Sequence, residues 1–189
     1  MPTRPAWILE NKPNQVVTLL ARIHYPYTFT VVSTEGNAPA AVLADSAEST
    51  LDEKNVEYIH QTLQSIAPYL LDGEGIGVSA GKAQSTTPDA VVGGKICDLC
   101  EMAHYTQWYA EYFSPFKFTI LDCDSCDVPI AVLGEHRVDV LPEAVEVMER
   151  ALNIVAERKY AEEFPKWMFD HNMRQIPNHY HFHVRPLLW

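Results

Sequence analysis

Basic residues are scarce in this sequence of 189 residues, which holds 14 lysines and arginines against 25 aspartates and glutamates. The formal net charge of -11 excludes a broad basic surface of the kind that binds nucleic acids or anionic membranes through counterion release. A small phosphorylated ligand in a local pocket stays compatible with this charge. The sequence also lacks an apolar run of roughly 20 residues, the length that spans a bilayer, and it starts without the apolar core of a signal peptide. We therefore expect a cytoplasmic protein with no membrane segment.

Cysteine is rare as well, and the first 95 residues contain none. The four cysteines form two pairs, CDLC at 97–100 and CDSC at 123–126, instead of being spread as a disulfide framework would be. With 22 residues between the pairs, the spacing alone is typical of a tetrahedral zinc site. Six of the eight histidines also lie after residue 95, so we expect the chemistry in the second half.

A repeated pattern relates the two halves. FTVVSTEGNAPAAVLADS at 29–46 and FTILDCDSCDVPIAVLGEH at 118–136 both read as a β-rich run, a polar turn, a proline and an apolar run. An amphipathic helix is expected after each, over about 50–70 and from Pro142 onward, and then an alternating strand, from Gly75 and from His179. Two unrelated α+β stretches that share a common idiom are the alternative explanation.

The repeat predicts an α+β protein of two units, residues 1–92 and 93–189, which share one sheet. The connection falls in QSTTPDAVVGGK at 84–95, which has the composition of a surface loop. Between 158 and 177, Pro165 and Pro177 interrupt the chain, so we expect a short helix and then an irregular loop. In the second helix, an apolar face is expected at Val145, Met148, Leu152 and Val155.

The predicted last strand carries the most specific signal, because His179, His181 and His183 alternate with apolar residues. Alternate residues of a strand share a face, so the three imidazoles would line one side while Tyr180, Phe182 and Val184 face a core. Three buried imidazoles all need partners, which favours a metal site or a phosphate site over simple core packing. A polar face turned to solvent is the plainer alternative.

The motif H-Y-H-F-H-V resembles the H-x-H-x-H-x signature of the histidine-triad superfamily of nucleotide hydrolases and transferases. The order of CDLC, VPIAVLGEH, a helix and the triad strand is similar to that of its zinc-containing branch across residues 96–189, with a degenerate copy in 1–95. The resemblance implies an antiparallel sheet with flanking helices. It also implies homodimers with joined sheets, or two units in one chain forming a pseudo-dimer.

The same resemblance implies an enzyme that acts on a nucleotide or another phosphorylated small molecule. His181 would be the nucleophile that attacks the phosphate, and His183 would act beside it. Phosphate and ribose contacts would come from the polar residues around the triad. These substrate-binding candidates are His179, Arg185, Asp122, Asn178 and Gln175.

Zinc would be bound, in that branch, by positions matched here by Cys97, Cys100, His136 and His179. Spacing alone keeps Cys123 and Cys126 as alternative ligands in a four-cysteine site.

The family usually places a further phosphate-site histidine two residues after a proline, where this sequence has Ala131 after Pro129. The glycine and the serine or threonine that usually precede the triad are missing too. The second hypothesis is therefore a catalytically inactive, zinc-containing binding or interaction protein on the same scaffold.

Overall fold

The computed structural model describes the C-terminal half almost continuously and shorter parts of the N-terminal half. The described residues are 17–24, 29–34, 40–43, 57, 59–63, 91–92, 95–103, 105–113, 116–160 and 162–187. The strand expected from Gly75 and most of the helix expected over 50–70 lie outside these ranges. Residues 59–63 are helical, as expected.

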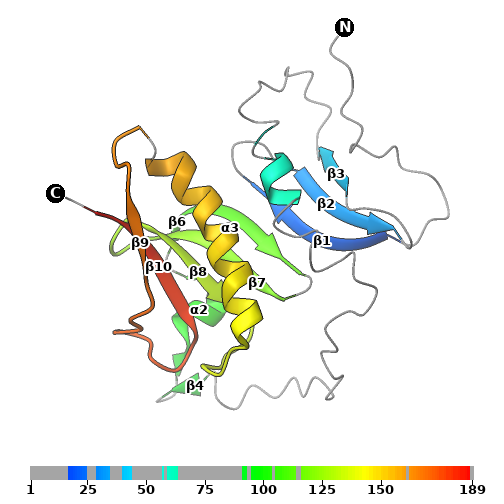
Figure 1. Ribbon diagram of the computed structural model, residues 1–189. Coiled ribbons are helices and arrows are strands. Elements are labelled where there is room, and N and C mark those ends of the chain that lie inside the picture. Colours follow the sequence, from blue (N-terminus) through cyan, green and yellow to red (C-terminus); the bar gives the residue numbers. More distant parts are fainter. Residues whose placement is uncertain are drawn as a thin grey trace, which may run out of the picture.

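The core of the fold is one sheet of eight strands, antiparallel in every pairing. Its strands run in the order β3-β2-β1-β6-β7-β8-β10-β9 (Figure 1). Their bounds are β1 (Val17–Ile23), β2 (Phe29–Thr34), β3 (Ala40–Leu43), β6 (Tyr105–Tyr112), β7 (Phe118–Cys123), β8 (Pro129–Leu133), β9 (Trp167–Asp170) and β10 (His181–Pro186). With the helices, this confirms the α+β class and a sheet shared between the two halves.

The two halves of the sheet are paired in the same register. Phe29 lies opposite Leu43 across β2 and β3, and Phe118 lies opposite Leu133 across β7 and β8, as the repeated sequence pattern aligns them. At the centre, β1 pairs with β6 so that Arg22 lies opposite Glu111. The strand order runs outward from this junction as β1-β2-β3 on one side and as β6-β7-β8 on the other. The two sets of three strands are therefore arranged as if a two-fold axis related them.

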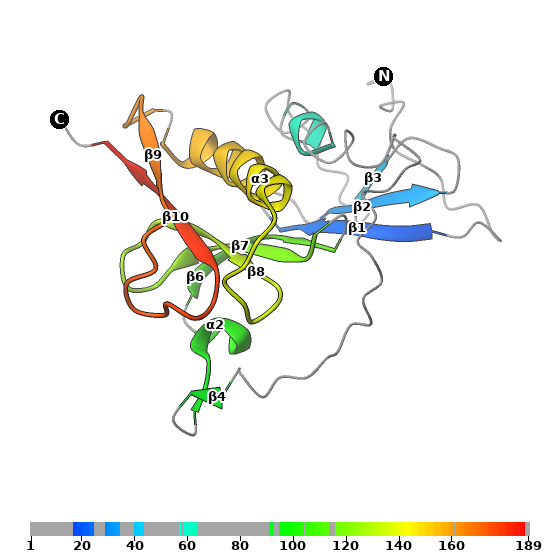
Figure 2. The ribbon, with the colours of Figure 1, turned by 60° about the horizontal axis from the view of Figure 1, so that its bottom comes forward.

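Helix α3 (Pro142–Tyr160) covers one face of the sheet, as Figure 2 shows. Proline is favoured in the first turn of a helix because it has no N–H to leave unpaired, and Pro142 begins α3 as predicted. The helix buries Met148, Leu152 and Val155, while Val145 is half-buried. Phe182 and Val184 of β10 join the same core. The helical residues 59–63 lie on the same side of the sheet, with Ile59 and Leu63 in that core (Figure 2).

The opposite face of the sheet carries the short helix α2 (Asp98–Glu101) and the small ribbon of β4 (Val91–Val92) and β5 (Lys95–Ile96) (Figure 2). Leu99 and Met102 pack there on a separate small core. This core contains Leu121, Ile130 and Val132.

Three expectations about local structure need correction. Part of the expected 84–95 connection is the ribbon of β4 and β5. The expected loop within 158–177 contains β9, which pairs as an edge strand with β10. The last strand begins at His181, not His179, although Leu133 N–H still donates to the Tyr180 carbonyl at 3.1 Å just before it. Within the described residues, no helix is both long and apolar enough to cross a membrane.

Candidate functional site

A cluster of two cysteines and two histidines joins three separate segments of the second half. Cys97 and Cys100 come from the start and the first turn of α2, His136 from the bend after β8, and His179 from the residues just before β10. The four potential ligand atoms all lie within 4.8 Å of one another. The four residues that the family resemblance implies as zinc ligands therefore lie close together in the structure.

The distances in this cluster suit a zinc ion. Nδ1 of His179 lies 3.5 Å from Sγ of both Cys97 and Cys100, and Nδ1 of His136 lies 3.2 Å from Sγ of Cys100. Tetrahedral zinc with ordinary Zn–S and Zn–N bonds separates a sulfur and a nitrogen ligand by about 3.5 Å. The cluster could therefore hold a metal ion without rearrangement, and two thiols with two imidazoles are a ligand set typical of structural zinc.

The orientation of His179 supports the same assignment. Its side chain is 1% exposed, and its Nε2 lies 2.7 Å from the carbonyl oxygen of Leu133. A carbonyl can only accept, so Nε2 carries the proton and donates, and Nδ1 presents its lone pair toward the sulfurs. Burial lowers the pKa of His179, which keeps the imidazole neutral as a ligand must be. The Nε2 atom of His136 is buried with no hydrogen-bond partner among the described residues.

Burial and the neighbouring Cys97 raise the pKa of Cys100 to about 11 in the absence of a cation. A bound cation would favour the ionised form of the Cys100 thiol.

A pocket of about 510 Å³ opens beside this cluster, on the α2 face of the sheet. It is bounded by α2, by the β7–β8 turn, by the 172–176 loop and by the triad strand β10. The lining residues are Asp98, Leu99, Met102, Leu121, Cys123, Asp124, Ser125, Cys126, Ile130, Asn172, Arg174, Gln175, Ile176, His181, His183 and Arg185.

His181 and His183 lie side by side in this pocket, with ring centroids 5.7 Å apart. They are 6% and 9% exposed, which rules out a triad face turned to solvent. Phe182 between them is fully buried in the α3 core, so the predicted alternation of faces is confirmed for these three residues.

The imidazole of His181 is held in one tautomer. Its Nδ1 lies 2.7 Å from the main-chain carbonyl oxygen of His179, so Nδ1 carries the proton and donates. Nε2 is then the unprotonated nitrogen, with its lone pair available for chemistry. Burial lowers the pKa of His181, so the ring is neutral at pH 7.

The ring of His183 is neutral as well, because burial and the nearby Arg185 lower its pKa to about 4. Its Nδ1 is buried and has no hydrogen-bond partner in the part of the chain that the structure describes. A ring nitrogen of His183 lies within 4.8 Å of the sulfurs of Cys123 and Cys126, which form a second group with metal-ligand geometry.

The two C-x-x-C pairs thus belong to different places. No group of ligand atoms within 4.8 Å of one another contains both pairs among the described residues. The structure therefore does not bring the four cysteines together, because the β7–β8 turn holds Cys123 and Cys126 against His183 in the pocket.

Arg185 lines the pocket and is the cation expected from the sequence. Its Nε donates to the Asp170 carboxylate on β9 at 2.8 Å. This hydrogen bond lowers the pKa of Asp170, although partial burial opposes the shift. Asp170 also accepts from the main-chain N–H of Asn172 at 3.2 Å, so it positions both the arginine and the start of the 172–176 loop.

Asp122 was expected to contact substrate, and the structure places it elsewhere. Residues 118, 120 and 122 of β7 face α3, whereas 121 and 123 face the pocket side. The buried Asp122 carboxylate accepts hydrogen bonds from Tyr109 Oη at 2.7 Å and from Lys159 Nζ at 2.8 Å. It therefore lies on the opposite face of the sheet from His181 and His183.

The other expected substrate contacts divide in two. Gln175 and Arg185 line the pocket, whereas Asn178 and His179 do not. Sequence reasoning missed Arg174 and Asn172, which also line it. The signal was available, since polar residues are concentrated in HNMRQ directly before the triad.

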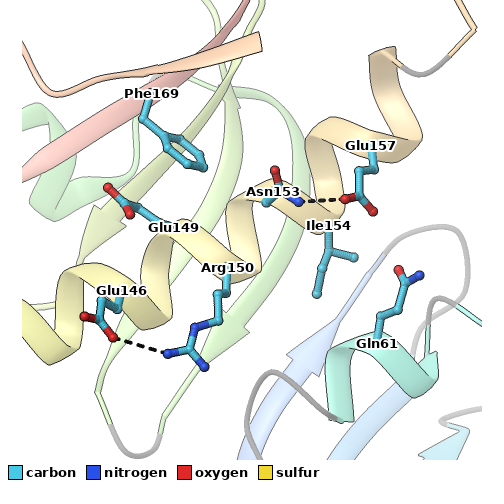
Figure 3. Close-up of a pocket in the computed structure, with 8 residues that line it drawn as sticks. All are labelled: Gln61, Glu146, Glu149, Arg150, Asn153, Ile154, Glu157 and Phe169. Carbon is cyan, nitrogen blue, oxygen red and sulfur yellow. Dashed lines mark hydrogen bonds and ion pairs between the residues drawn. The ribbon is translucent and has the colours of Figure 1, made fainter. Parts of the chain in front are cut away.

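A second hollow, of about 630 Å³, lies on the α3 side between α3 and the helical residues 59–63 (Figure 3). Its polar residues pair along the helix, Arg150 with Glu146 at 3.3 Å and Asn153 with Glu157 at 2.7 Å. Such i,i+4 pairs are ordinary for an exposed helix face, so this hollow offers no chemistry comparable to that of the pocket.

Comparison of the chain with family models, with curated proteins and with solved structures finds no match in any of the three.

Proposed function

We propose that the protein is a zinc-containing nucleotide hydrolase or nucleotidyltransferase of the histidine-triad type. The observation that carries the proposal is the orientation of His181, whose Nδ1–H is held by the His179 carbonyl while the ring lines the pocket. A histidine nucleophile needs an unprotonated nitrogen facing the substrate, and this arrangement supplies one without a separate base.

In the proposed reaction, Nε2 of His181 forms a bond to a nucleotide phosphorus atom, and the bond from phosphorus to the leaving group breaks. Water or an acceptor hydroxyl then attacks the phosphorus, the N–P bond breaks, and the imidazole lone pair is restored. The attacking water or hydroxyl gives up its proton to bulk water in this second step, and the leaving group of the first step departs with the electron pair of the broken bond and takes a proton from bulk water.

Negative charge on the non-bridging oxygens is stabilised by positioned donors. Arg185, Arg174 and Gln175 line the pocket and can donate to these oxygens. The guanidinium groups matter most here, because the net charge of the chain is -11 and gives a phosphate no general attraction.

The proposed zinc ion has a structural role. Bound by Cys97, Cys100, His136 and His179, it would fasten α2 and the β8 bend to the start of β10. The His179 carbonyl that orients His181 belongs to one of these ligands, so the metal supports the nucleophile indirectly.

One observation favours the inactive alternative. The position two residues after Pro129 is Ala131, which is fully buried in the α3 core, so no side chain at that position reaches the pocket. The pocket thus lacks the family's further histidine, and a protein that binds nucleotides without turning them over is the second candidate.

The decisive experiment measures turnover of adenosine phosphoramidate and of dinucleoside polyphosphates by the zinc-loaded protein. We expect turnover that His181→Ala abolishes, with an unchanged circular dichroism spectrum. His60→Ala, at an exposed histidine in the helical residues 59–63, is the matched control and should keep full activity. Nucleotide binding without turnover would favour the inactive alternative, and turnover that survives His181→Ala would exclude His181 as nucleophile.

A further inference from the structure

A second group of soft metal ligands lies in the wall of the pocket, apart from the cluster of Cys97, Cys100, His136 and His179. The sulfurs of Cys123 and Cys126 and a ring nitrogen of His183 all lie within 4.8 Å of one another. Thiolates and a neutral imidazole are the ligands that zinc and related thiophilic cations select.

His183 provides an independent sign that something is bound here. The residue is 9% exposed, yet its Nδ1 has no hydrogen-bond partner among the described residues. Leaving a buried polar atom without a partner is energetically costly, so such atoms are rare unless a ligand satisfies them. The neighbouring His181, in contrast, satisfies its own Nδ1 with the main-chain carbonyl of His179.

The turn that carries the two cysteines is fixed in place. Cys123 N–H donates to the Val128 carbonyl at 3.0 Å, and Asp127 N–H donates back to the Cys123 carbonyl at 2.8 Å. Asp127 adopts a left-handed conformation with φ of 51°, which aspartate tolerates better than most residues. Lys159 from α3 donates to the Asp127 carbonyl at 3.0 Å and so holds the turn from the other face.

Polar neighbours surround the two thiols. The hydroxyl of Ser125 lies 3.1 Å from Sγ of Cys123. The guanidinium of Arg185 interacts favourably with the Cys126 side chain. A hydroxyl and a guanidinium are donors that suit sulfurs which carry negative charge.

We propose that Cys123, Cys126 and His183 bind a second metal ion, zinc or another thiophilic divalent cation, whose fourth coordination position opens into the pocket. Two thiolates neutralise a divalent cation, and the guanidinium groups of Arg185 and Arg174 in the same pocket can donate hydrogen bonds to an anion bound there. An anionic oxygen, such as that of a phosphate group, is the ligand that suits the open position. The site stands on its own geometry and does not depend on whether His181 attacks a nucleotide.

The test is the metal stoichiometry of the full chain, purified under reducing conditions, exposed to excess Zn²⁺ and desalted. We expect two equivalents of zinc per chain. The double variant Cys123→Ser/Cys126→Ser should retain one equivalent, and so should His183→Ala, with an unchanged circular dichroism spectrum in each case. Ser125→Ala is the matched control, because it alters the same turn without removing a ligand and should retain two equivalents.

Cobalt provides the second measurement. Co²⁺ bound to thiolates absorbs strongly in the near ultraviolet through sulfur-to-metal charge transfer, and titration should saturate at two equivalents with two distinguishable spectra. Adding inorganic phosphate should shift only the visible bands lost in Cys123→Ser/Cys126→Ser, because only that ion has an open position.

Only one equivalent in the unchanged protein, retained in Cys123→Ser/Cys126→Ser, would overturn the proposal, and so would a Cys123–Cys126 disulfide that persists under reducing conditions. A single equivalent lost in this variant would uphold the pocket site and remove the cluster at Cys97 from consideration. An unchanged stoichiometry in His183→Ala would exclude that histidine as a ligand and overturn the three-residue site.

Discussion

Asp122 at the end of β7 and Lys159 in the last turn of α3 form an ion pair of 2.8 Å across the core face of the sheet. The Asp122 side chain is 6% exposed, and its second carboxylate oxygen is buried without a partner among the described residues. The negative charge of this buried carboxylate is therefore stabilised by Lys159 and Tyr109.

Removing only the lysine should be costly. Lys159→Met leaves a buried carboxylate with one donor, so we expect the free energy of unfolding to fall by about 1–3 kcal/mol in urea denaturation. In Asp122→Asn/Lys159→Met, part of this loss should be recovered because no buried charge remains. Equal losses in the single and double variants would contradict this explanation.

A substitution of Asp122 also tests whether this residue contacts the nucleotide. Because it lies on the face opposite His181, Asp122→Asn should leave the nucleotide dissociation constant unchanged, as measured by calorimetric titration. A loss of affinity of tenfold or more, with stability retained, would restore the ribose contact expected from the sequence.

Gly134 should not tolerate a side chain. A Cβ at this position would lie 2.5 Å from Cγ of Lys117 and 2.9 Å from the Lys117 carbonyl oxygen. We expect Gly134→Ala to lower the free energy of unfolding by about 1–3 kcal/mol, since the long side chain can move but the main-chain oxygen cannot. Adding Lys117→Ala should restore only part of the loss. Because His136 follows two residues later, the zinc content should fall as well.

Zinc bound at Cys97 should contribute directly to folding. A ligand present at 100 times its dissociation constant stabilises the folded state by about 2.7 kcal/mol, so Cys97→Ser should lower the melting temperature and reduce the effect of a chelator on it. Glu101→Gln, at an exposed non-ligand residue of α2, is the control. A chelator effect as large in Cys97→Ser as in the unchanged protein would exclude Cys97 as a ligand.

The tautomer of His181 can be observed without any substrate. Nitrogen-15 NMR of the imidazoles should show Nδ1 of His181 protonated and Nε2 bare at pH 7, because the His179 carbonyl accepts from Nδ1. The opposite tautomer would remove the basis for Nε2 as the attacking atom.

Arg185 should contribute to anion binding. Arg185→Gln removes a charge-assisted donor worth about 1.5–3 kcal/mol, which corresponds to a nucleotide affinity weakened by about 10-fold to 100-fold. Arg150→Gln removes an exposed arginine on the α3 side and should leave the affinity unchanged. Equal effects of the two variants would mean that the loss reflects overall charge and not the pocket.

The sequence predicted elements whose signals are local. Pro142 and the apolar spacing that follows it predicted α3, and the paired positions of Phe29 and Phe118 predicted two strand pairs in the same register. The four-residue strand β9 was missed because it is stabilised by its pairing with β10, which is a tertiary contact. The sequence of so short a segment beside Pro165 does not indicate such a pairing.

The error at Asp122 has a different origin. Alternation along a strand gives the two faces of that strand, but it does not say which face of the next strand is the same one. Only the register of β7, β8 and β10 shows that Leu121, Ile130 and His183 share a side. The same strand register was needed to see that the two C-x-x-C pairs lie apart. The binding of zinc by Cys97, Cys100, His136 and His179 stays a prediction.

The pairing of β1 with β6 also decides how the molecule responds to dilution. Where two such sheets meet between separate chains, the junction dissociates as the protein becomes scarce, and the midpoint of unfolding depends on concentration. Here both strands belong to one chain, so the junction is intramolecular and persists at any concentration. In a single chain the two halves can also acquire different side chains, whereas the two copies in a homodimer must share every substitution. This difference fits a molecule whose four cysteines all lie in its second half.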